Sequence, residues 1–297
     1  MNKRRNDLLK LFKRRPGSHK GDYGHVFILA GSAGLTGAAY LTSQGALISG
    51  SGLVTLGIPK SLNPVMARKL TEVMTKPLPE TRSQSLSQKA FSEIRKFLEK
   101  RDVLAIGPGL SQHKETQLLI RKIILCCNKP MVIDADALNA LAGCVKGLVK
   151  IPRRQSATVL TPHPGEMGRL INKSTGFVQK DRKNIAKEFA KKYNVTLVLK
   201  GHHTVVASPR NIYINKTGNP GMASGGVGDV LTGVIASFLG QGLSGFDAAK
   251  LGVYVHGLAG DLSAKEKGQL SLTAIDLLNK LPKALRRCSS AGRAAVL

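Results

Sequence analysis

Short apolar runs alternate with helical patterns along most of the chain. Runs typical of buried strands occupy residues 25–31, 52–58, 103–107, 130–136, 157–161 and 196–201. Between them, the spacing of apolar residues predicts helices at 36–50 and near 87–99, 112–126, 136–142 and 179–193. Continuous apolar strands separated by helices are typical of a parallel sheet covered on both faces. The pattern therefore predicts an α/β fold with a mostly parallel central sheet.

The remaining segments depart from this alternation. Residues 203–208 and 210–215 flank Ser208-Pro209-Arg210 and predict a β-hairpin. After it, helical spacing predicts three helices at 227–240, 245–264 and 273–286. The proline-rich segment 59–86 is interpreted as an irregular peripheral excursion, and "DLLKLFKRR" near the N-terminus as an opening helix.

No linker, repeat or low-complexity segment divides the chain, so we expect one domain. We place it at residues 18–285, between a basic N-terminal extension, 1–17, and a basic C-terminal tail, 286–297. Tryptophan is absent and aromatic residues make up 4% of the 297 residues, so the core must consist of aliphatic side chains. This composition disfavours modules that stack nucleic-acid bases on aromatic platforms.

The 45 basic and 18 acidic side chains give a formal net charge of +27. Such an excess serves either an anionic surface, such as nucleic acid or membrane, or a set of small anionic substrates. No nucleic-acid-binding motif accompanies the charge, and no apolar run reaches the ~18–20 residues that span a bilayer. We therefore expect no specific nucleic-acid partner and no membrane partner.

The four cysteines contain no C-x-x-C pair, and the N-terminus lacks the apolar core of a secretory signal. Both features indicate reduced thiols and a cytoplasmic location.

Four segments with suspected binding chemistry directly follow predicted strands: "AGSAGLTGA", "IGPGL", "LTPHPGE" and "LKGHHT". In open α/β sheets, ligands bind beyond the carboxyl ends of the strands, so these turns are expected to meet at one site. The glycines of "GSAGLTG" either let a polar ligand approach the next helix or only form a tight turn. No Walker A sequence is present, which disfavours a P-loop nucleotide site.

The segment "NPGMASGGVGDVLTG" (219–233) concentrates glycines where a helix is expected to begin. The N–H groups of Gly225, Gly226, Val227 and Gly228 are expected to form an anion hole, because the first amides of a helix lack intrahelical partners. Asp229 in the first turn either acts as a general base or only complements the helix dipole, worth about 0.3–1 kcal/mol. Three glycines within four positions exceed what capping requires, so we favour catalysis.

The histidines and two further aspartates allow structural and functional interpretations. His163 follows a strand on a proline-flanked turn, where it either binds a ligand or only stabilises the turn. His202 and His203 are expected on opposite faces of a strand, which disfavours a metal site, and His256 is expected to pack inside a helix. Within "VIDADALN", Asp136 is expected either to cap the next helix or to have a functional role. Asp134 either has a structural role or helps hold Mg²⁺ or its water shell.

The motifs "GSAGLTGAAYL", "AIGPGL", "VIDADALNAL", "LTPHPGEMGRL", "LVLKGHHTVV", "GNPGMASGGVGDVLTGVIASFLGQG" and "GVYVHGLAGD" occur in the order seen in NAD(P)H-hydrate dehydratases. The chain resembles this family over roughly residues 18–280, with Leu35 where methionine is common. The resemblance implies a ribokinase-like three-layer α/β/α fold of the stand-alone bacterial type, without an epimerase domain. Relatives of this type are commonly homo-oligomers, and a tetramer is expected.

The implied activity is metabolite repair by a lyase: ADP-dependent dehydration of (6S)-NADHX and (6S)-NADPHX to NADH and NADPH, with release of AMP and phosphate. The C6 hydroxyl is phosphorylated with Mg²⁺ present, and phosphate is then eliminated; some relatives use ATP. Matched by motif, the hydrated substrate would contact Ala38, Gly109, His163 and Asp229, with Asp229 as base. The adenine nucleotide would contact Lys200, Gly201, His202, His203, Thr204 and Gly228.

Two alternatives are distinguishable. An ATP-dependent ribokinase-like kinase of a small vitamin-precursor alcohol would share "GGVGD" and the same base, but "LTPHPGE" with "NPGMASGGVGD" disfavours it. A non-catalytic nucleic-acid-associated protein would bind polyanions with steep salt dependence and would tolerate loss of Asp229.

Overall fold

The computed structural model describes residues 11, 14–150 and 157–291. Its described residues contain a nine-stranded sheet in the order β3-β2-β1-β4-β5-β6-β7-β8-β9. Strands β1 to β7 run parallel, and β8 and β9 join antiparallel at the edge. The strands are β1 His25–Leu29, β2 Leu53–Pro59, β3 Met74–Leu78, β4 Val103–Ile106, β5 Met131–Ile133, β6 Thr158–Leu160, β7 Thr196–Leu199, β8 Val205–Ala207 and β9 Ile212–Ile214.

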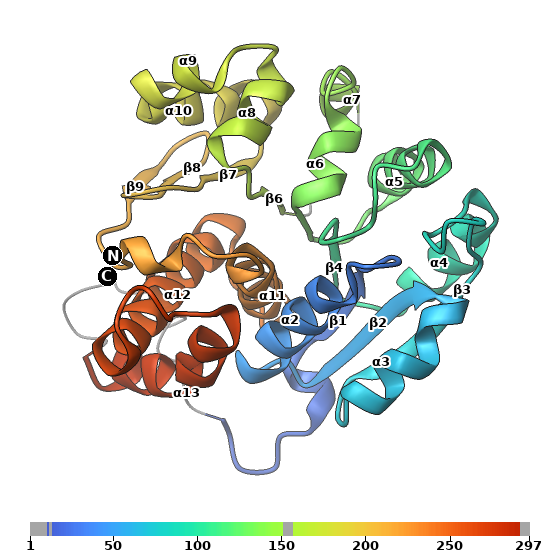
Figure 1. Ribbon diagram of the computed structural model, residues 1–297, viewed down its shortest axis with the longest axis horizontal. Coiled ribbons are helices and arrows are strands. Elements are labelled where there is room, and N and C mark those ends of the chain that lie inside the picture. The colour runs from blue at the N-terminus through green and yellow to red at the C-terminus, as the bar shows by residue number, and fades with distance from the viewer. Residues whose placement is uncertain (1–10, 12–13, 151–156, 292–297) are drawn as a thin grey trace.

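Helices cover both faces of this sheet, as Figure 1 shows. One face packs against α2 Thr36–Ile48, α3 Asn63–Lys69, α11 Val227–Gly240, α12 Gly245–Lys267 and α13 Ala274–Ala291. The other packs against α4 Phe91–Leu98, α5 Lys114–Cys126, α6 Ala135–Leu141, α8 Pro164–Ile171, α9 Thr175–Lys180 and α10 Arg182–Tyr193. A short helix α7, Gly147–Lys150, follows α6. The expected three-layer α/β/α architecture is confirmed.

The parallel strands bury alternate side chains on opposite faces. In β1, Val26 and Ile28 belong to the core beneath α2 and α11, whereas Phe27 and Leu29 belong to the core beneath α4 and α5. All four are fully buried. Because both faces are covered, the strands read as continuous apolar runs, which is why the sequence predicted them.

The strand order reverses between β1 and β4, which are neighbours in the sheet although β2 and β3 lie between them in the chain. The connections leaving these two strands depart to opposite faces: α2 follows β1 on one, and α5 follows β4 on the other. Such a switch point opens a crevice at the carboxyl ends of the two strands.

The expectation of an irregular segment at 59–86 is wrong. This segment contains α3 and β3, and β3 pairs in parallel with β2 from Thr55↔Met74 to Pro59↔Leu78. Pro77 is compatible with a strand because β3 lies at the sheet edge, where an amide donor is dispensable. A turn after β3 brings Gln84 back to the switch point, where its carbonyl accepts the N–H of Ala33 at 3.1 Å.

Other expectations hold with shifted boundaries. The hairpin forms from β8 and β9, and α13 continues to Ala291, beyond the expected end at 286. The helices α8 and α9 were not expected. The predicted opening helix at 7–15 lies largely outside the described residues. None of the described helices combines the length and apolar character needed to cross a bilayer.

Helices α2 and α11 meet at unusually short range because small residues face each other. A Cβ atom on Gly233 would lie 2.1 Å from the carbonyl oxygen of Thr42, and one on Gly45 would lie 2.7 Å from that of Val230. Only residues without side chains permit this contact between two helical backbones. The position of α11 is thereby fixed against the helix that follows the switch point.

Candidate active site

The four glycine- and proline-rich turns meet at one edge of the sheet, as expected. At the switch point, Gly31 N–H donates to the Pro108 carbonyl at 2.9 Å, and Ser32 Oγ donates to the Gly109 carbonyl at 2.8 Å. Farther along the same edge, Lys200 N–H donates to the Pro162 carbonyl at 2.9 Å. These bonds tie the turns after β1 and β4, and those after β6 and β7, into one continuous rim.

Helix α11 begins at this rim with a glycine-rich turn. Gly226, its N-cap, has φ 86°, and a Cβ there would lie 2.4 Å from Leu41 Cδ1. The described residues offer no hydrogen-bond acceptor to the N–H groups of Gly225, Gly226, Gly228 or Asp229. Amides of this kind at the positive end of a helix dipole are suited to bind an anion.

Asp229 lies in the first turn of α11 and is partly buried. Burial raises the pKa of its carboxyl to about 7, with a further upward contribution from Asp134 and an opposing one from Lys200. Such a carboxylate is largely deprotonated just above neutral pH yet basic enough to accept a proton. Simple dipole complementation would not require this environment.

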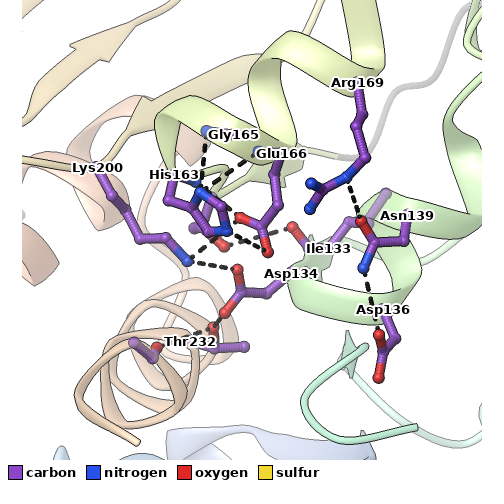
Figure 2. A network of polar contacts seen from close by, with 12 residues as sticks. Ile133, Asp134, Asp136, Asn139, His163, Gly165, Glu166, Arg169, Lys200 and Thr232 are labelled. Atoms are coloured by element: carbon purple, nitrogen blue, oxygen red, sulfur yellow. Dashed lines mark hydrogen bonds and ion pairs between the residues drawn. The ribbon is translucent and has the colours of Figure 1, made fainter. Parts of the chain in front are cut away.

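Beside Asp229, a buried ion pair joins β5, β7 and α11 (Figure 2). Lys200 Nζ lies 2.8 Å from Asp134 Oδ1, and Thr232 Oγ1 donates to Asp134 Oδ2 at 2.7 Å. Burial acts to lower the pKa of Lys200, but the carboxylates of Asp134 and Glu166 raise it above its usual range. The ammonium therefore stays charged at the start of α11.

His163 has a structural role that the sequence left open. It is the N-cap of α8, where its Nδ1 accepts the N–H groups of Gly165 at 3.0 Å and Glu166 at 3.4 Å. Glu166 Oε2 in return accepts the His163 N–H at 2.7 Å, which completes a capping box. Burial, Lys200 and Arg169 lower the pKa of His163, which favours the neutral ring, and its Nε2 lies 3.5 Å from Glu166 Oε1.

The expectation that Asp136 caps the next helix is wrong. Asp134 occupies the N-cap position of α6, and Asp136 lies in its first turn. Asp136 instead accepts the backbone N–H of Ser111 at 2.9 Å and the Asn139 amide at 3.3 Å. It thus joins the turn after β4 to the helix after β5.

A cavity of about 690 Å³ opens next to the start of α11. The cavity is lined by all the residues that were expected to contact the nucleotide: Lys200, Gly201, His202, His203, Thr204 and Gly228. His163, part of 215–224, and side chains of α11 and α12 complete its lining. The cavity therefore gathers residues from four separate segments of the chain.

His202 and His203 do not lie on a strand, as the sequence suggested, but in the turn between β7 and β8. Their rings lie against each other, with centroids 3.8 Å apart and planes tilted by 32°, instead of pointing to opposite faces. Arg182 holds this turn through hydrogen bonds from Nη2 to the carbonyls of His202 at 2.6 Å and His203 at 2.5 Å. The turn frees both rings to face the cavity.

Ala38 and Gly109 belong to the switch point and do not line this cavity. They touch each other, since a Cβ on Gly109 would lie 3.0 Å from Ala38 Cβ. His256 is buried as expected, and its Nε2 lies 2.9 Å from the Val227 carbonyl. The start of α11 thus has the cavity on one side and the switch point on the other.

Sequence reasoning missed the segment 215–224 as a wall of the cavity. Asp261 on α12 fixes it by accepting the Gly218 N–H and the Asn219 side-chain amide, both at 3.0 Å. The available signal was the acid in "GVYVHGLAGD", which nothing else in that segment explains. The roles of Glu166 and Thr232 were missed as well.

The described residues contain no cluster of three or more His, Cys, Asp or Glu side chains arranged to hold a metal ion. They do place several carboxylates near the cavity, which suits Mg²⁺, an ion commonly held by one or two carboxylates, waters and substrate phosphates. Both oxygens of Asp134 already accept hydrogen bonds. Glu166 is buried as well, and its oxygens contact His163 and Lys200, so the described residues single out no carboxylate as the ligand of such an ion.

Comparison with known proteins agrees with this arrangement. The bifunctional NAD(P)H-hydrate repair enzyme Nnr of Moorella thermoacetica is 47% identical over 278 residues, which are 93% of this chain and 52% of that protein. The chain thus spans about half the length of the curated relatives it matches. Among solved structures, a ribokinase-like superfamily protein from Enterococcus faecalis V583 has a TM-score of 0.80 at 26% identity, covering 95% of this chain and 94% of that one.

A second solved structure is the ADP/ATP-dependent NAD(P)H-hydrate dehydratase of Bacillus subtilis, which was co-crystallized with ATP and Mg²⁺. It is 32% identical, has a TM-score of 0.77 and covers 93% of both chains. The family model described as NAD(P)H-hydrate dehydratase matches residues 26–283. The chain therefore belongs to the NAD(P)H-hydrate dehydratase family.

Proposed function

We propose that this chain dehydrates (6S)-NADHX and (6S)-NADPHX to NADH and NADPH at the expense of ADP, releasing AMP and phosphate. The observation that carries this proposal is Asp229, a partly buried carboxylate whose pKa is raised to about 7 in a glycine-rich first turn. It directly follows Gly228, which lines the cavity, on the helix that packs against α2 after the switch point. This arrangement supports proton abstraction coupled to phosphoryl transfer.

The two substrates are assigned to opposite sides of the α11 N-terminus. ADP occupies the cavity lined by residues 200–204, with its terminal phosphate toward Gly228 and Lys200. The hydrated nicotinamide ring lies at the switch point, against Ala38 and Gly109, and donates its C6 hydroxyl to Asp229. The neutral His163 supplies Nε2–H as a donor to the substrate.

The chemistry follows from this placement. Asp229 takes the proton of the C6 hydroxyl while the hydroxyl oxygen attacks the terminal phosphorus of ADP. The bond between that phosphorus and the bridging oxygen breaks, and this oxygen leaves with AMP. The resulting phosphate ester is a better leaving group than hydroxide. The ring nitrogen lone pair expels phosphate, and loss of a proton from the adjacent ring carbon restores the reduced nicotinamide. The reaction therefore needs no external oxidant or reductant.

The protein stabilises the phosphoryl group during transfer with preorganised charges. The amides of Gly225, Gly226 and Gly228 and the ammonium of Lys200 would surround the position that the group passes through. Val227, expected in the same anion hole, instead donates its N–H to the Ser224 carbonyl at 3.5 Å. A divalent cation held by the phosphates would supply further positive charge here and would neutralise part of theirs. Electrostatic groups that need not reorganise during transfer are the most effective ones.

The test compares wild type with Asp229→Asn and, as a matched surface control, Glu188→Gln on α10. With NADHX and ADP, the rate at which the near-ultraviolet absorbance of NADH recovers is expected to fall about 100- to 10,000-fold in Asp229→Asn, the range of a lost general base. Glu188→Gln is expected to match wild type, and circular dichroism checks that both variants fold. Near-normal turnover by Asp229→Asn would refute the assigned base.

The nucleotide choice is tested by the products. Incubation of wild type with NADHX and either ADP or ATP is expected to give faster turnover with ADP, and AMP as the nucleotide product. An ATP-dependent kinase of a small alcohol would instead accumulate a stable phosphate ester and leave NADHX unchanged. We also propose a homo-tetramer, to be checked by light scattering, and a cytoplasmic location, to be checked by fractionation.

A further inference from the structure

The ion pair between Lys200 and Asp134 is placed too specifically to serve only the fold. Lys200 extends from the end of β7 until its Nζ lies 3.4 Å from where a Cβ of Gly228 would stand. The absence of a side chain at Gly228 therefore gives the ammonium room at the first turn of α11. Its side chain remains 20% exposed, toward the cavity, whereas that of Asp134 is only 2% exposed.

A lysine side chain is flexible, so holding its charge at one point requires a rigid partner. Asp134 is such a partner because it comes directly after β5, and its N–H donates to the Ile106 carbonyl of β4 at 3.1 Å. Oδ1 of Asp134 binds Lys200, so the orientation of the Asp134 carboxylate depends on the partner of its other oxygen, Oδ2.

That second contact comes from α11 itself. Thr232 is fully buried and donates to Asp134 Oδ2 at 2.7 Å, whereas its contact with the Gly228 carbonyl, the usual partner of a helical threonine, is 3.3 Å. Thr232 stands one turn after Asp229 on the same helix. The helix that carries the base thus also orients the carboxylate that holds the lysine.

We propose that Asp134 and Thr232 are positioning residues: together they fix the Lys200 ammonium beside the α11 amides for phosphoryl transfer. The inference rests on the proposed function and extends it to two side chains that do not touch the substrate. Transition-state stabilisation needs the lysine in one place, whereas substrate binding tolerates small movements, so kcat depends on this chain of contacts more than KM.

The experiment uses Thr232→Val, Thr232→Ser and Ser237→Ala. Ser237 is a matched control because its buried hydroxyl, on the same helix, bonds to Ser51 and Gln241, away from the site. Thr232→Val is expected to lower kcat about 10- to 100-fold with KM values within about threefold of wild type, the signature of an interaction realised in the transition state. Thr232→Ser is expected to recover most of kcat, and Ser237→Ala to retain it.

A second measurement does not depend on turnover. Limited acetylation of the intact protein, read by mass spectrometry at Lys200, is expected to rise in Thr232→Val and not in Thr232→Ser or Ser237→Ala. Equal Lys200 labelling in all four proteins, or wild-type kcat in Thr232→Val, would overturn the inference. Absence of NADHX turnover by the wild type would instead defeat the proposed function, and the labelling would still decide whether Thr232 holds the lysine.

Discussion

The first turn of α11 has two differently built surroundings, which meet at Lys200. On one side, Asp134 and Thr232 are buried and fully hydrogen bonded, and they hold a lysine of raised pKa. On the other, the cavity wall contains exposed residues of the β7–β8 turn, His202 and His203, whose position depends on Arg182. The first side consists of charges fixed by the sheet and a helix, whereas the second is a surface turn.

The difference separates chemistry from recognition. Buried charges in a low-dielectric setting act strongly on a reacting phosphate and cannot move without loss of rate. Exposed ring and amide contacts contribute modestly to binding and tolerate replacement. Substitutions on the buried side are therefore expected to change kcat, and those on the exposed side KM.

Among changes that compare these two surroundings, the largest effect is expected from Lys200→Met. Removing the ammonium takes a positive charge from the phosphoryl path, and we expect kcat to fall by about 100- to 1,000-fold. The variant is also expected to unfold at lower temperature, because Asp134 loses its ion-pair partner. Steady-state kinetics at a temperature where circular dichroism shows folded protein measure the first effect. A kcat within threefold of wild type would remove Lys200 from the chemistry.

An intermediate effect is expected from pH. The pKa of Asp229 is raised to about 7, and only its ionised form accepts a proton, so kcat is expected to fall about tenfold per pH unit below 7 and to level off above it. Lys200, whose pKa is raised, stays protonated across this range. The measurement is a pH–rate profile under saturating substrates. A flat profile from pH 5 to pH 8 would contradict Asp229 as the base.

The smallest effect is expected from His202→Ala on the exposed side. Loss of one exposed ring contact in the cavity is expected to raise the KM for ADP by about three- to tenfold and to leave kcat unchanged. Turnover at varied ADP and at varied NADHX provides the measurement. An effect on the KM for NADHX alone would mean that ADP does not contact His202. It would also contradict the expectation that substitutions among the exposed residues change the KM for ADP.

The fold was largely readable from the chain because both faces of the sheet are covered, which leaves continuous apolar runs. The misread segment 59–86 fails this rule: β3 lies at the edge, and its exposed or half-exposed Met74, Thr75 and Lys76 carry no buried-strand signal. The helix α8 was missed because "TPHPGE" looks like a turn, although its histidine and glutamate form the capping box that starts this helix.

The site was only partly readable. Asp229 stood out because its glycine neighbours mark a helix start with a bare backbone. The link between Asp134 and Thr232 joins residues 98 positions apart, and no local pattern signals it. His202 and His203 were wrongly expected on a strand. A positive φ at His203 (53°) turns the chain at a position where the apolar neighbours suggested a strand. Such long-range pairs and local reversals depend on the assembled fold.

The backbone contact between α2 and α11 also limits how the enzyme can adjust during a catalytic cycle. Gly45 and Gly233 bring the backbones of the two helices into direct contact, so a shift of one helix toward the other meets immediate steric resistance. The base and the switch-point wall then keep their mutual geometry whether the site is empty or filled. Under the proposed function, we therefore expect the opening that admits the nucleotide to come from the opposite wall, formed by the β7–β8 turn and residues 215–224.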